Sequence, residues 1–304
     1  MTKRLLITGG SGYLGRHVAR RLAAGWPGEW RYTTFSTNPL GLPQGARLDV
    51  RDGVAVAQFV ADFAPDAVIH TAGSNTTPDM AAVIVDGTRH VAAAAARAGA
   101  RLVHLSTDSV FGGDRAPYDE SAAPAPINDY GRAKAAAEAL ALAHPNAVVV
   151  RTSLIYGLAE MDNGTAWMAA ALRAGQPVTL FTNQRRNPVW VETLVNACLE
   201  LLDLPTTGVL NVAGRQTLSR ADYALRLLDW WGVTERETLS LAEDSSGRWP
   251  VDCTMDVGLA ARLLRTPLLG VDEVLAIGQG RGGAERNRRA LVAVVRPGLV
   301  NGGP

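Results

Sequence analysis

The chain has 304 residues, a length that favours one large domain with a smaller lobe over a single compact core. Hydrophobic residues make up 47% and charged residues 19%, as in an ordinary soluble globular protein. The formal net charge of +1 gives no support for a nucleic-acid partner or a membrane surface, and no apolar run reaches the roughly 18 residues of a membrane span.

The N-terminus and the cysteines bear on where the protein works. The first apolar stretch is only Leu5–Ile7, far shorter than the ~7–15 residues of a signal peptide. Cys198 and Cys253 give neither a disulfide framework nor a metal cluster, and both are expected to be small buried residues. We therefore expect a cytoplasmic, reduced protein.

The first half of the chain alternates short β-branched or apolar runs with longer alanine-rich segments. Strands are expected at Lys3–Thr8, Arg31–Ser36, Ala67–Thr71, Arg101–Ser106 and Ala147–Thr152. Helices are expected between them, at Tyr13–Ala24, Val54–Phe63, Met80–Ala98 and Tyr130–Ala143. This alternation requires crossovers, so it predicts an α/β fold with a doubly wound parallel sheet, a Rossmann domain over residues 1–152.

The pattern changes after residue 152. Helical segments dominate, at Thr165–Ala174, Val191–Leu202, Arg220–Trp231 and Asp256–Leu264, with strand-like pieces at Pro177–Leu180 and Val209–Val212. We expect a smaller, mostly helical substrate lobe over residues 153–277, with the option of returning strands to the main sheet. Residues 278–304, rich in glycine and arginine, are expected to be a poorly ordered tail, or an oligomer contact through Leu291–Val295.

A glycine motif, Thr8–Gly15, directly follows the first expected strand and opens a helix. Gly9, Gly12 and Gly15 permit a tight turn, a close approach of the backbone to a pyrophosphate, and close packing of helix on strand. The anion would lie on free N–H groups at the helix N-terminus. The motif predicts dinucleotide binding.

The residues after the second strand bear on which dinucleotide is bound. An NAD enzyme usually has an acidic residue there, to hold the ribose 2′-hydroxyl. This chain has Ser36 and its neighbours instead, and Arg16 follows the last motif glycine. Without the repelling acid, and with Arg16 as an attracting cation, NADP (NADPH) is preferred and NAD is left open. An ordinary solvated position for Arg16 is the alternative.

Tyr130 and Lys134 stand four residues apart on an expected helix, and so share a face. A cation near a phenol lowers its pKa, which suits a general acid. By itself this spacing is common on helices, where it is usually a surface pair. Ser106–Ser109 adds a cluster of hydroxyls at the end of the fifth strand, where doubly wound sheets form their ligand crevice.

Taken together, these motifs resemble the extended short-chain dehydrogenase/reductase superfamily, and within it the dTDP-4-dehydrorhamnose reductase group. The resemblance covers about residues 3–275. It is carried by the glycine motif and by Leu48–Asp52, His70–Gly73, Ser106–Phe111, Tyr130–Lys134, Arg151–Gly157 and Asn183–Val191.

The resemblance implies catalytic roles for Thr107, Tyr130 and Lys134. Thr107 would hold the substrate carbonyl, Tyr130 would deliver the proton, and Lys134 would bind the nicotinamide ribose and lower the pKa of Tyr130. Residues implied in cofactor binding are Gly9, Ser11, Gly12, Tyr13, Leu14, Gly15, Arg16, Ser36, Asp49, Val50, Thr71, Ala72, Gly73, Tyr130 and Lys134.

Substrate contacts are expected from two segments. Thr107, Asp108 and Ser109 follow the fifth strand, and Gln184, Arg186 and Trp190 lie in the second segment. In that second segment, Gln184 and Asn187 can hydrogen-bond sugar or base. Arg185 or Arg186 can pair with a diphosphate, and Trp190 offers an apolar face. A solvated loop for the arginines and a packing role for Trp190 are the alternatives.

Three further positions are notable. The chain has Asp86 where the family usually has Asn, which puts fine active-site geometry in question. His70 and His104 lie in buried-looking strands and are expected to be packed, hydrogen-bonded core residues. No arrangement of residues points to a metal site.

The predicted function is an NADP-dependent reductase of a keto group on a nucleotide-linked deoxysugar. The partner is a small molecule, a nucleoside-diphosphate sugar, rather than nucleic acid or membrane; a homodimer is left open. One alternative keeps the catalytic residues but reduces a non-sugar carbonyl or epimerises a sugar. Another, of a different class, is a non-catalytic NADP-binding regulatory subunit.

Overall fold

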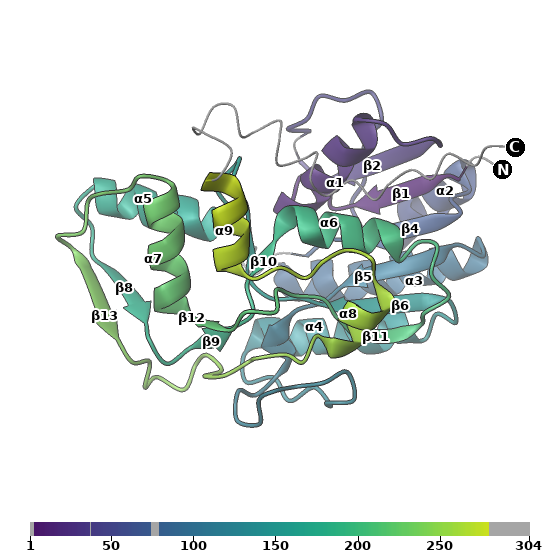
Figure 1. Cartoon of the computed structure of the whole chain (residues 1–304). Helices are drawn as coiled ribbons and strands as arrows, with labels where there is room; N and C mark the ends of the chain where they lie inside the picture. The colour runs from purple at the N-terminus through teal and green to yellow at the C-terminus, as the bar shows by residue number, and fades with distance from the viewer. Residues whose placement is uncertain (1–2, 37, 74–78, 280–304) are drawn as a thin grey trace, which may run out of the picture.

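The structure is a computed structural model that describes residues 3–36, 38–73 and 79–279. Its central strands are β1 (Leu5–Thr8), β2 (Trp30–Thr34), β3 (Gly45–Arg47), β4 (Ala67–His70), β5 (Arg101–Leu105), β6 (Ala147–Arg151) and β11 (Gly208–Asn211). They form one seven-stranded parallel sheet in the order β11-β6-β5-β4-β1-β2-β3 (Figure 1). The chain runs outward from β1 to β3 and then crosses back to β4, which creates a topological switch point beside β1.

Both faces of the sheet are buried. In β1, Leu5 and Ile7 pack into one apolar cluster, whereas Leu6 packs into a second cluster. Successive side chains on a strand point to opposite faces, so this run of apolar residues supplies both cores at once. The predicted doubly wound parallel sheet is confirmed.

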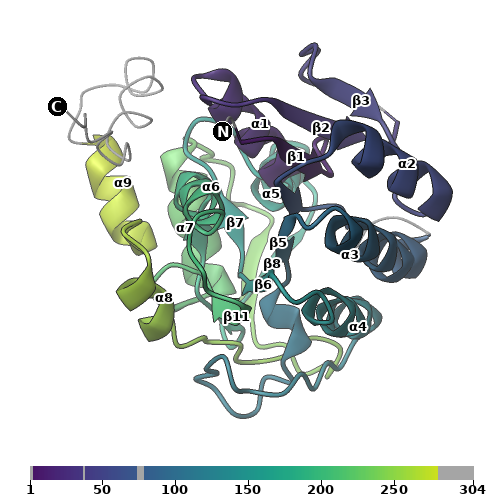
Figure 2. The same cartoon turned by 90° about the vertical axis from the view of Figure 1, so that its right-hand side faces the viewer.

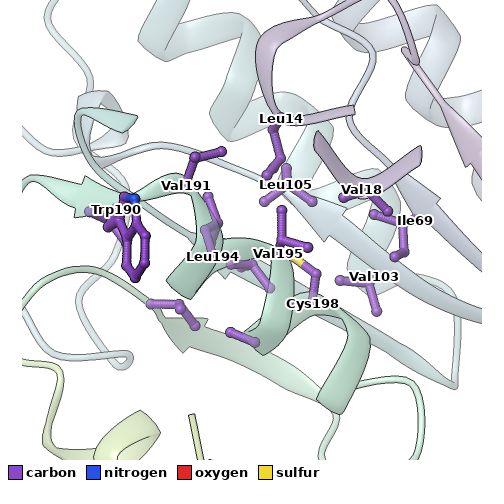
Figure 3. Packing of buried hydrophobic residues seen from close by; sticks show 14 of the residues in the cluster. Leu14, Val18, Ile69, Val103, Leu105, Trp190, Val191, Leu194, Val195 and Cys198 are labelled. Atoms are coloured by element: carbon purple, nitrogen blue, oxygen red, sulfur yellow. The ribbon is translucent and has the colours of Figure 1, made fainter. Parts of the chain in front are cut away.

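Helices cover each face (Figure 2). On one face α1 (Tyr13–Ala23) packs beside α6 (Val191–Glu200). The other face carries α2 (Gly53–Phe63), α3 (Gly87–Arg97) and α4 (Asp129–Leu142), and a π-helical turn at Ala82–Asp86 precedes α3. Figure 3 shows side chains of α1 and α6 meeting those of the strands, among them Val18, Cys198 and Ile69.

A smaller lobe stands beside the carboxyl edge of the sheet (Figure 1). It contains α5 (Asn163–Arg173), α7 (Arg220–Trp230) and the parallel pair β8 (Val178–Phe181) and β13 (Leu239–Ala242), which share an apolar cluster. Two short ribbons join lobe and sheet: β7 (Ile155–Tyr156) with β10 (Val189–Trp190), and β9 (Arg185–Arg186) with β12 (Leu218–Ser219). Near the end of the described chain lie α8 (Gly258–Leu263) and α9 (Val271–Gln279).

All nine expected strands and helices of the first half are present, within a few residues of their expected ends. The strand β3 was not expected, because it has only three residues. The piece near Val209–Val212 is β11, which joins the main sheet beside β6. The division of the chain at residue 152 stays a prediction, and residues 280–304 of the expected tail lie outside the described residues.

Candidate functional site

A cavity of about 290 Å³ opens at the carboxyl ends of β1, β2 and β4, at the switch point of the sheet. Its lining includes nine of the residues expected to bind the cofactor: Gly9, Ser11, Gly12, Ser36, Asp49, Val50, Thr71, Ala72 and Gly73. Thr33, Thr34, Phe35, Leu48, Arg51, Asp79 and Val83, which were not singled out from the sequence, complete it.

The start of α1 is shaped by glycine. Gly9 has φ +82°, and a Cβ there would lie 2.6 Å from the backbone nitrogen of Ala72. A Cβ on Gly15 would lie 2.3 Å from the carbonyl oxygen of Gly9, so only glycine lets helix and strand pack this closely. Gly12 supplies no side-chain cap, and the first internal bond of the helix runs from Arg16 N to Gly12 O. Gly12 N donates to the carbonyl oxygen of Gly9, so the N–H groups of Tyr13, Leu14 and Gly15 are the ones left to meet an anion.

Four further residues expected to bind the cofactor do not line the cavity: Tyr13, Leu14, Gly15 and Arg16. Leu14 is buried in the core, and the Tyr13 hydroxyl donates to the carbonyl oxygen of Glu160 at 2.8 Å. Arg16 is paired with Glu160: its Nη2 lies 2.7 Å from Glu160 Oε1, and its guanidinium covers the Tyr13 ring. Glu160 therefore holds Arg16 away from the cavity. The expected contact of Arg16 with the cofactor stays a prediction. Through their backbones, Tyr13, Leu14 and Gly15 can still face an anion at the helix N-terminus.

A different arginine lies in the cavity wall. Arg51 binds both carboxylate oxygens of Asp49, pairs with Asp79 at 2.6 Å, and lies over the Phe35 ring at 5.1 Å. The Arg51 guanidinium holds the pKa of Asp49 below its usual range. Sequence reasoning missed Arg51, although it stands in the quoted stretch Leu48–Asp52.

Thr107, Tyr130 and Lys134 come together at the carboxyl end of β5. The Thr107 side chain acts on the Tyr130 phenol as a hydrogen-bonding neighbour. Lys134 Nζ donates to the carbonyl oxygen of Leu105 at 2.5 Å. The side chain of Asn128 caps α4, so the helix begins just before Tyr130. Thr107 and Lys134 thus both lie at the end of β5, and Tyr130 is a neighbour of Thr107.

The proton affinity of Tyr130 differs from the expectation. Burial raises the pKa of Tyr130 to about 12; the hydrogen bond with Thr107 opposes this rise, and Asp108 adds to it. The expected lowering by Lys134 is therefore wrong, because burial dominates and the ammonium group is bound to Leu105. A phenol with this pKa keeps its proton at neutral pH, as a proton donor must.

Below this group lies a buried ionic network. Glu138, one helical turn beyond Lys134, lies 2.8 Å from Arg151 and accepts a hydrogen bond from Ser106 at 2.5 Å. Burial lowers the pKa of Lys134 to about 8, and Glu138 raises it. Glu138 was also missed, although its spacing of four from Lys134 was a usable signal.

Two histidines lie near Lys134, with ring centres 5.3 Å apart. His70 is hydrogen-bonded to Thr8 at 2.6 Å and to Thr88 at 3.1 Å, as expected for a satisfied core residue. His104 is fully buried, as expected, but neither ring nitrogen has a hydrogen-bond partner among the described residues, so the expected hydrogen bonding of His104 is wrong. Burial and the charge of Lys134 lower the pKa of both imidazoles, that of His70 to about 3, so both are neutral.

Asp108 joins this strand end to the lobe. Ser153 Oγ donates to Asp108 Oδ2 at 2.6 Å, and Arg186 Nε lies 3.5 Å from the same oxygen. The hydroxyls of Thr107 and Ser109 each lie 3.4 Å from Oδ1. The buried carboxylate is thus surrounded by donors of this protein.

Arg186 is a buried structural residue. Its guanidinium donates to the carbonyl oxygens of Arg185, Val251 and Pro250 at 2.7, 3.1 and 2.8 Å. With Asp108 as its counter-ion and these carbonyls as acceptors, Arg186 has little capacity left for a ligand. The alternative of a solvated loop is wrong for Arg186, which is buried, whereas Arg185 is exposed. The expected diphosphate contact stays a prediction.

The neighbours of Arg186 in the same segment are also held by contacts within the protein. Gln184 is buried and donates to Asp244 Oδ2 at 2.7 Å. Asn187 is buried, and its side chain accepts from Met255 N at 2.8 Å. Trp190 is only 3% exposed and packs in the core, as Figure 3 shows. The packing alternative is therefore the correct one for Trp190.

Comparison with known proteins identifies the family. The profile described as the RmlD substrate binding domain matches residues 3–250. A dTDP-4-dehydrorhamnose reductase of Mycobacterium tuberculosis is 33% identical over 240 residues, 76% of this chain and 77% of the relative. The chain belongs to the RmlD substrate binding domain family. This confirms the resemblance to the extended short-chain dehydrogenase/reductases.

Solved structures of similar proteins agree with this membership. A hypothetical dTDP-4-dehydrorhamnose reductase from Sulfolobus tokodaii superposes with a TM-score of 0.77 at 28% identity, covering 88% of this chain and 97% of that one. The dTDP-4-dehydrorhamnose reductase of Bacillus anthracis, in complex with NADP, gives 0.74 at 25% identity, covering 88% and 94%. The methionine adenosyltransferase 2 subunit beta of Xenopus laevis is 26% identical over 305 residues, 90% of this chain and 87% of the relative.

Within this family fold, Asp86 has a plain local role. Its carboxylate pairs with Arg89 one turn later, on the exposed side of the helix. In the described ranges no helix has the length and apolar character for crossing a membrane, and no cluster of His, Cys, Asp and Glu has the makings of a metal site.

Proposed function

We propose that the protein is an NADPH-dependent reductase of a keto group on a nucleotide-linked deoxysugar. The observation that carries the proposal is that Thr107, Tyr130 and Lys134 gather at the carboxyl end of β5, on the sheet edge that also holds the dinucleotide cavity. Family membership and the dTDP-4-dehydrorhamnose reductases among the relatives support it.

The cavity residues fit a dinucleotide. The uncapped start of α1 offers N–H groups to a pyrophosphate, and Ala72 and Gly73 form the adjacent wall. At the other end of the cavity the chain has Ser36 in place of an acidic residue that would repel a 2′-phosphate. Arg51 lies in the cavity wall. The NADP complex of the Bacillus anthracis relative supports NADP as the preferred cofactor, with NAD left open.

A bound reduced nicotinamide supplies the hydride that the reaction needs. Thr107 and Tyr130 would bind the substrate carbonyl oxygen through their hydroxyls. Tyr130 then transfers its proton to that oxygen as negative charge develops there. Lys134 contributes a positive charge beneath the phenol, while Glu138 and Leu105 hold the lysine in place.

The direct test is oxidation of NADPH by the purified protein on addition of dTDP-4-dehydrorhamnose. We expect turnover with this substrate and a slower rate with NADH. Binding of NADPH without oxidation, for this and other keto sugars, would contradict the proposal. That result would favour a regulatory subunit, a candidate raised by the match to methionine adenosyltransferase 2 subunit beta.

We further propose a cytoplasmic protein that forms a homodimer. The net charge of +1 and the ordinary composition support the cytoplasm as its location. Light scattering at micromolar concentration tests the dimer, and a monomer at every concentration would contradict it.

A further inference from the structure

Arg220 is the first residue of α7 and faces the junction of lobe and sheet. Ser219 caps the helix, and Arg220 N donates to the carbonyl oxygen of Gln184 at 2.8 Å. The antiparallel ribbon pairs Ser219 with Arg185 and Leu218 with Arg186. Arg220 therefore lies next to the segment whose Arg186 pairs with Asp108.

The charges around Arg220 are already paired with one another. Asp108 is bound by Ser153 and Arg186, and Arg186 is taken up by backbone carbonyls. Across the described parts of the chain, the exposed guanidinium of Arg220 has neither a hydrogen bond nor an ion pair. Desolvation and the like charge of Arg186 lower the pKa of Arg220, whereas Asp108 and Tyr223 raise it. Arg220 is therefore an exposed cation without a counter-ion among the described residues, at the junction of lobe and sheet.

This place belongs to the proposed active site. Asp108 directly follows Thr107, a neighbour of Tyr130. An anion next to Arg220 would thus lie close to Asp108, the residue that follows Thr107. The 11-residue helix α7 adds the partial positive charge of its N-terminus at the same point.

We propose that Arg220 binds the phosphate groups of the nucleotide-linked substrate and selects for substrates that carry them. Arg186 instead holds the lobe segment and Asp108 in position. The inference rests on the proposed function and assigns its anion contact to one residue. A guanidinium suits the task because it can make two parallel charge-assisted bonds to phosphate oxygens.

The test is calorimetric titration of dTDP into the full-length protein saturated with NADPH. Arg220→Ala should weaken dTDP binding about 10- to 100-fold, as expected for a lost charge-assisted bond. Arg220→Lys should recover part of the loss, because the charge remains but the two-pronged geometry does not. In turnover, KM for the sugar nucleotide should rise more than kcat falls.

Arg226→Ala is the matched control. Arg226 lies on the same helix, where it pairs with Asp272, so its loss should leave dTDP binding unchanged. Wild-type affinity for dTDP in Arg220→Ala would overturn the assignment while leaving the proposed function intact. An equal loss of NADPH and dTDP binding would also overturn it. If the wild type neither binds dTDP nor reduces a keto sugar, the proposed function itself fails, and this inference fails with it.

Discussion

Tyr130 and Lys134 show how burial sets the chemistry of single residues. Desolvation disfavours the charged form of each side chain, so the pKa of the phenol rises to about 12 and that of the amine falls to about 8. A phenol and an ammonium group that interact only with each other would shift in the opposite directions, the pKa of the phenol down and that of the amine up. Spacing along the helix predicts that the groups meet, but it carries no information on how much water reaches them.

The proton-donor role predicts a specific loss in Tyr130→Phe. Turnover should drop by about 10²–10⁴-fold, because the general acid is gone, while NADPH binding survives. Tyr156→Phe is the control, since the Tyr156 hydroxyl is buried without a partner among the described residues. Steady-state kinetics and a binding titration measure both effects. Unchanged turnover in Tyr130→Phe would contradict the assignment.

The lowered pKa of Lys134 predicts a pH profile. Protonated Lys134 prevails below about pH 8, so kcat/KM should fall as the pH rises through that value. His70 and His104 stay neutral across this range, and Tyr130 stays protonated, so none of them accounts for the change. The residual activity of Tyr130→Phe should keep the same falling limb. A limb that disappears with the phenol would assign the titration to Tyr130 instead.

Cofactor choice is predicted to depend on the charge at position 36. Ser36 lines the cavity, and Ser36→Asp should shift preference from NADPH towards NADH by repelling the 2′-phosphate. Ser36→Asn provides a side chain of similar size without the charge and should keep the preference for NADPH. The ratio of kcat/KM for the two cofactors measures the shift. A wild type that prefers NADH would refute this interpretation.

At the scale of elements, the stretch that leads into α6 shows that a local sequence pattern does not predict which side chains contact a ligand. Trp190 stands in a stretch with many polar residues, which suggested a ligand contact, yet it ends a strand and precedes the buried helix α6. The Trp190 ring points into the core because α6, which follows it, packs against α1 and the sheet.

A packing role predicts a loss of stability rather than of recognition. Trp190→Ala should lower the free energy of unfolding by about 3–5 kcal/mol, the usual cost of deleting a buried aromatic side chain. Trp167→Ala, at a side chain that is 62% exposed, should change it by less than about 0.5 kcal/mol. Chemical denaturation measures both. A stable Trp190→Ala protein with a raised KM for substrate would restore the ligand role.

The same scale explains what the sequence could and could not predict. Long runs such as Ala147–Thr152 and the glycine motif have strong periodicity or geometry, so their elements and positions follow from local pattern. The strand β3 is too short to carry such a signal, and the pairing of β11 with β6 depends on tertiary contacts. Likewise, Arg16 and Arg186 have the right chemistry for phosphates, but their partners Glu160 and Asp108 come from distant parts of the chain.

On the scale of the whole molecule, the fold gathers one site from remote segments. The carboxyl ends of β1, β2 and β4 form the cavity, β5 and α4 bring Thr107 and Tyr130, and α7 brings Arg220 from the lobe (Figure 1). The parallel sheet places all of these strand ends on one edge. Such an arrangement can hold a dinucleotide and a second, anionic molecule side by side.

The central claim is hydride transfer to a substrate carbonyl, and isotope transfer measures it most directly. The protein is incubated with dTDP-4-dehydrorhamnose and NADPH deuterated at the reactive nicotinamide carbon, and the sugar product is examined by mass spectrometry. We predict a product alcohol that carries one deuterium at the reduced carbon, formed by the wild type and strongly diminished in Tyr130→Phe. The reactive carbon carries two hydrogens, so NADPH deuterated at each of them is tested in turn. Recovery of unreduced substrate, or of a product without deuterium in both experiments, would contradict the account.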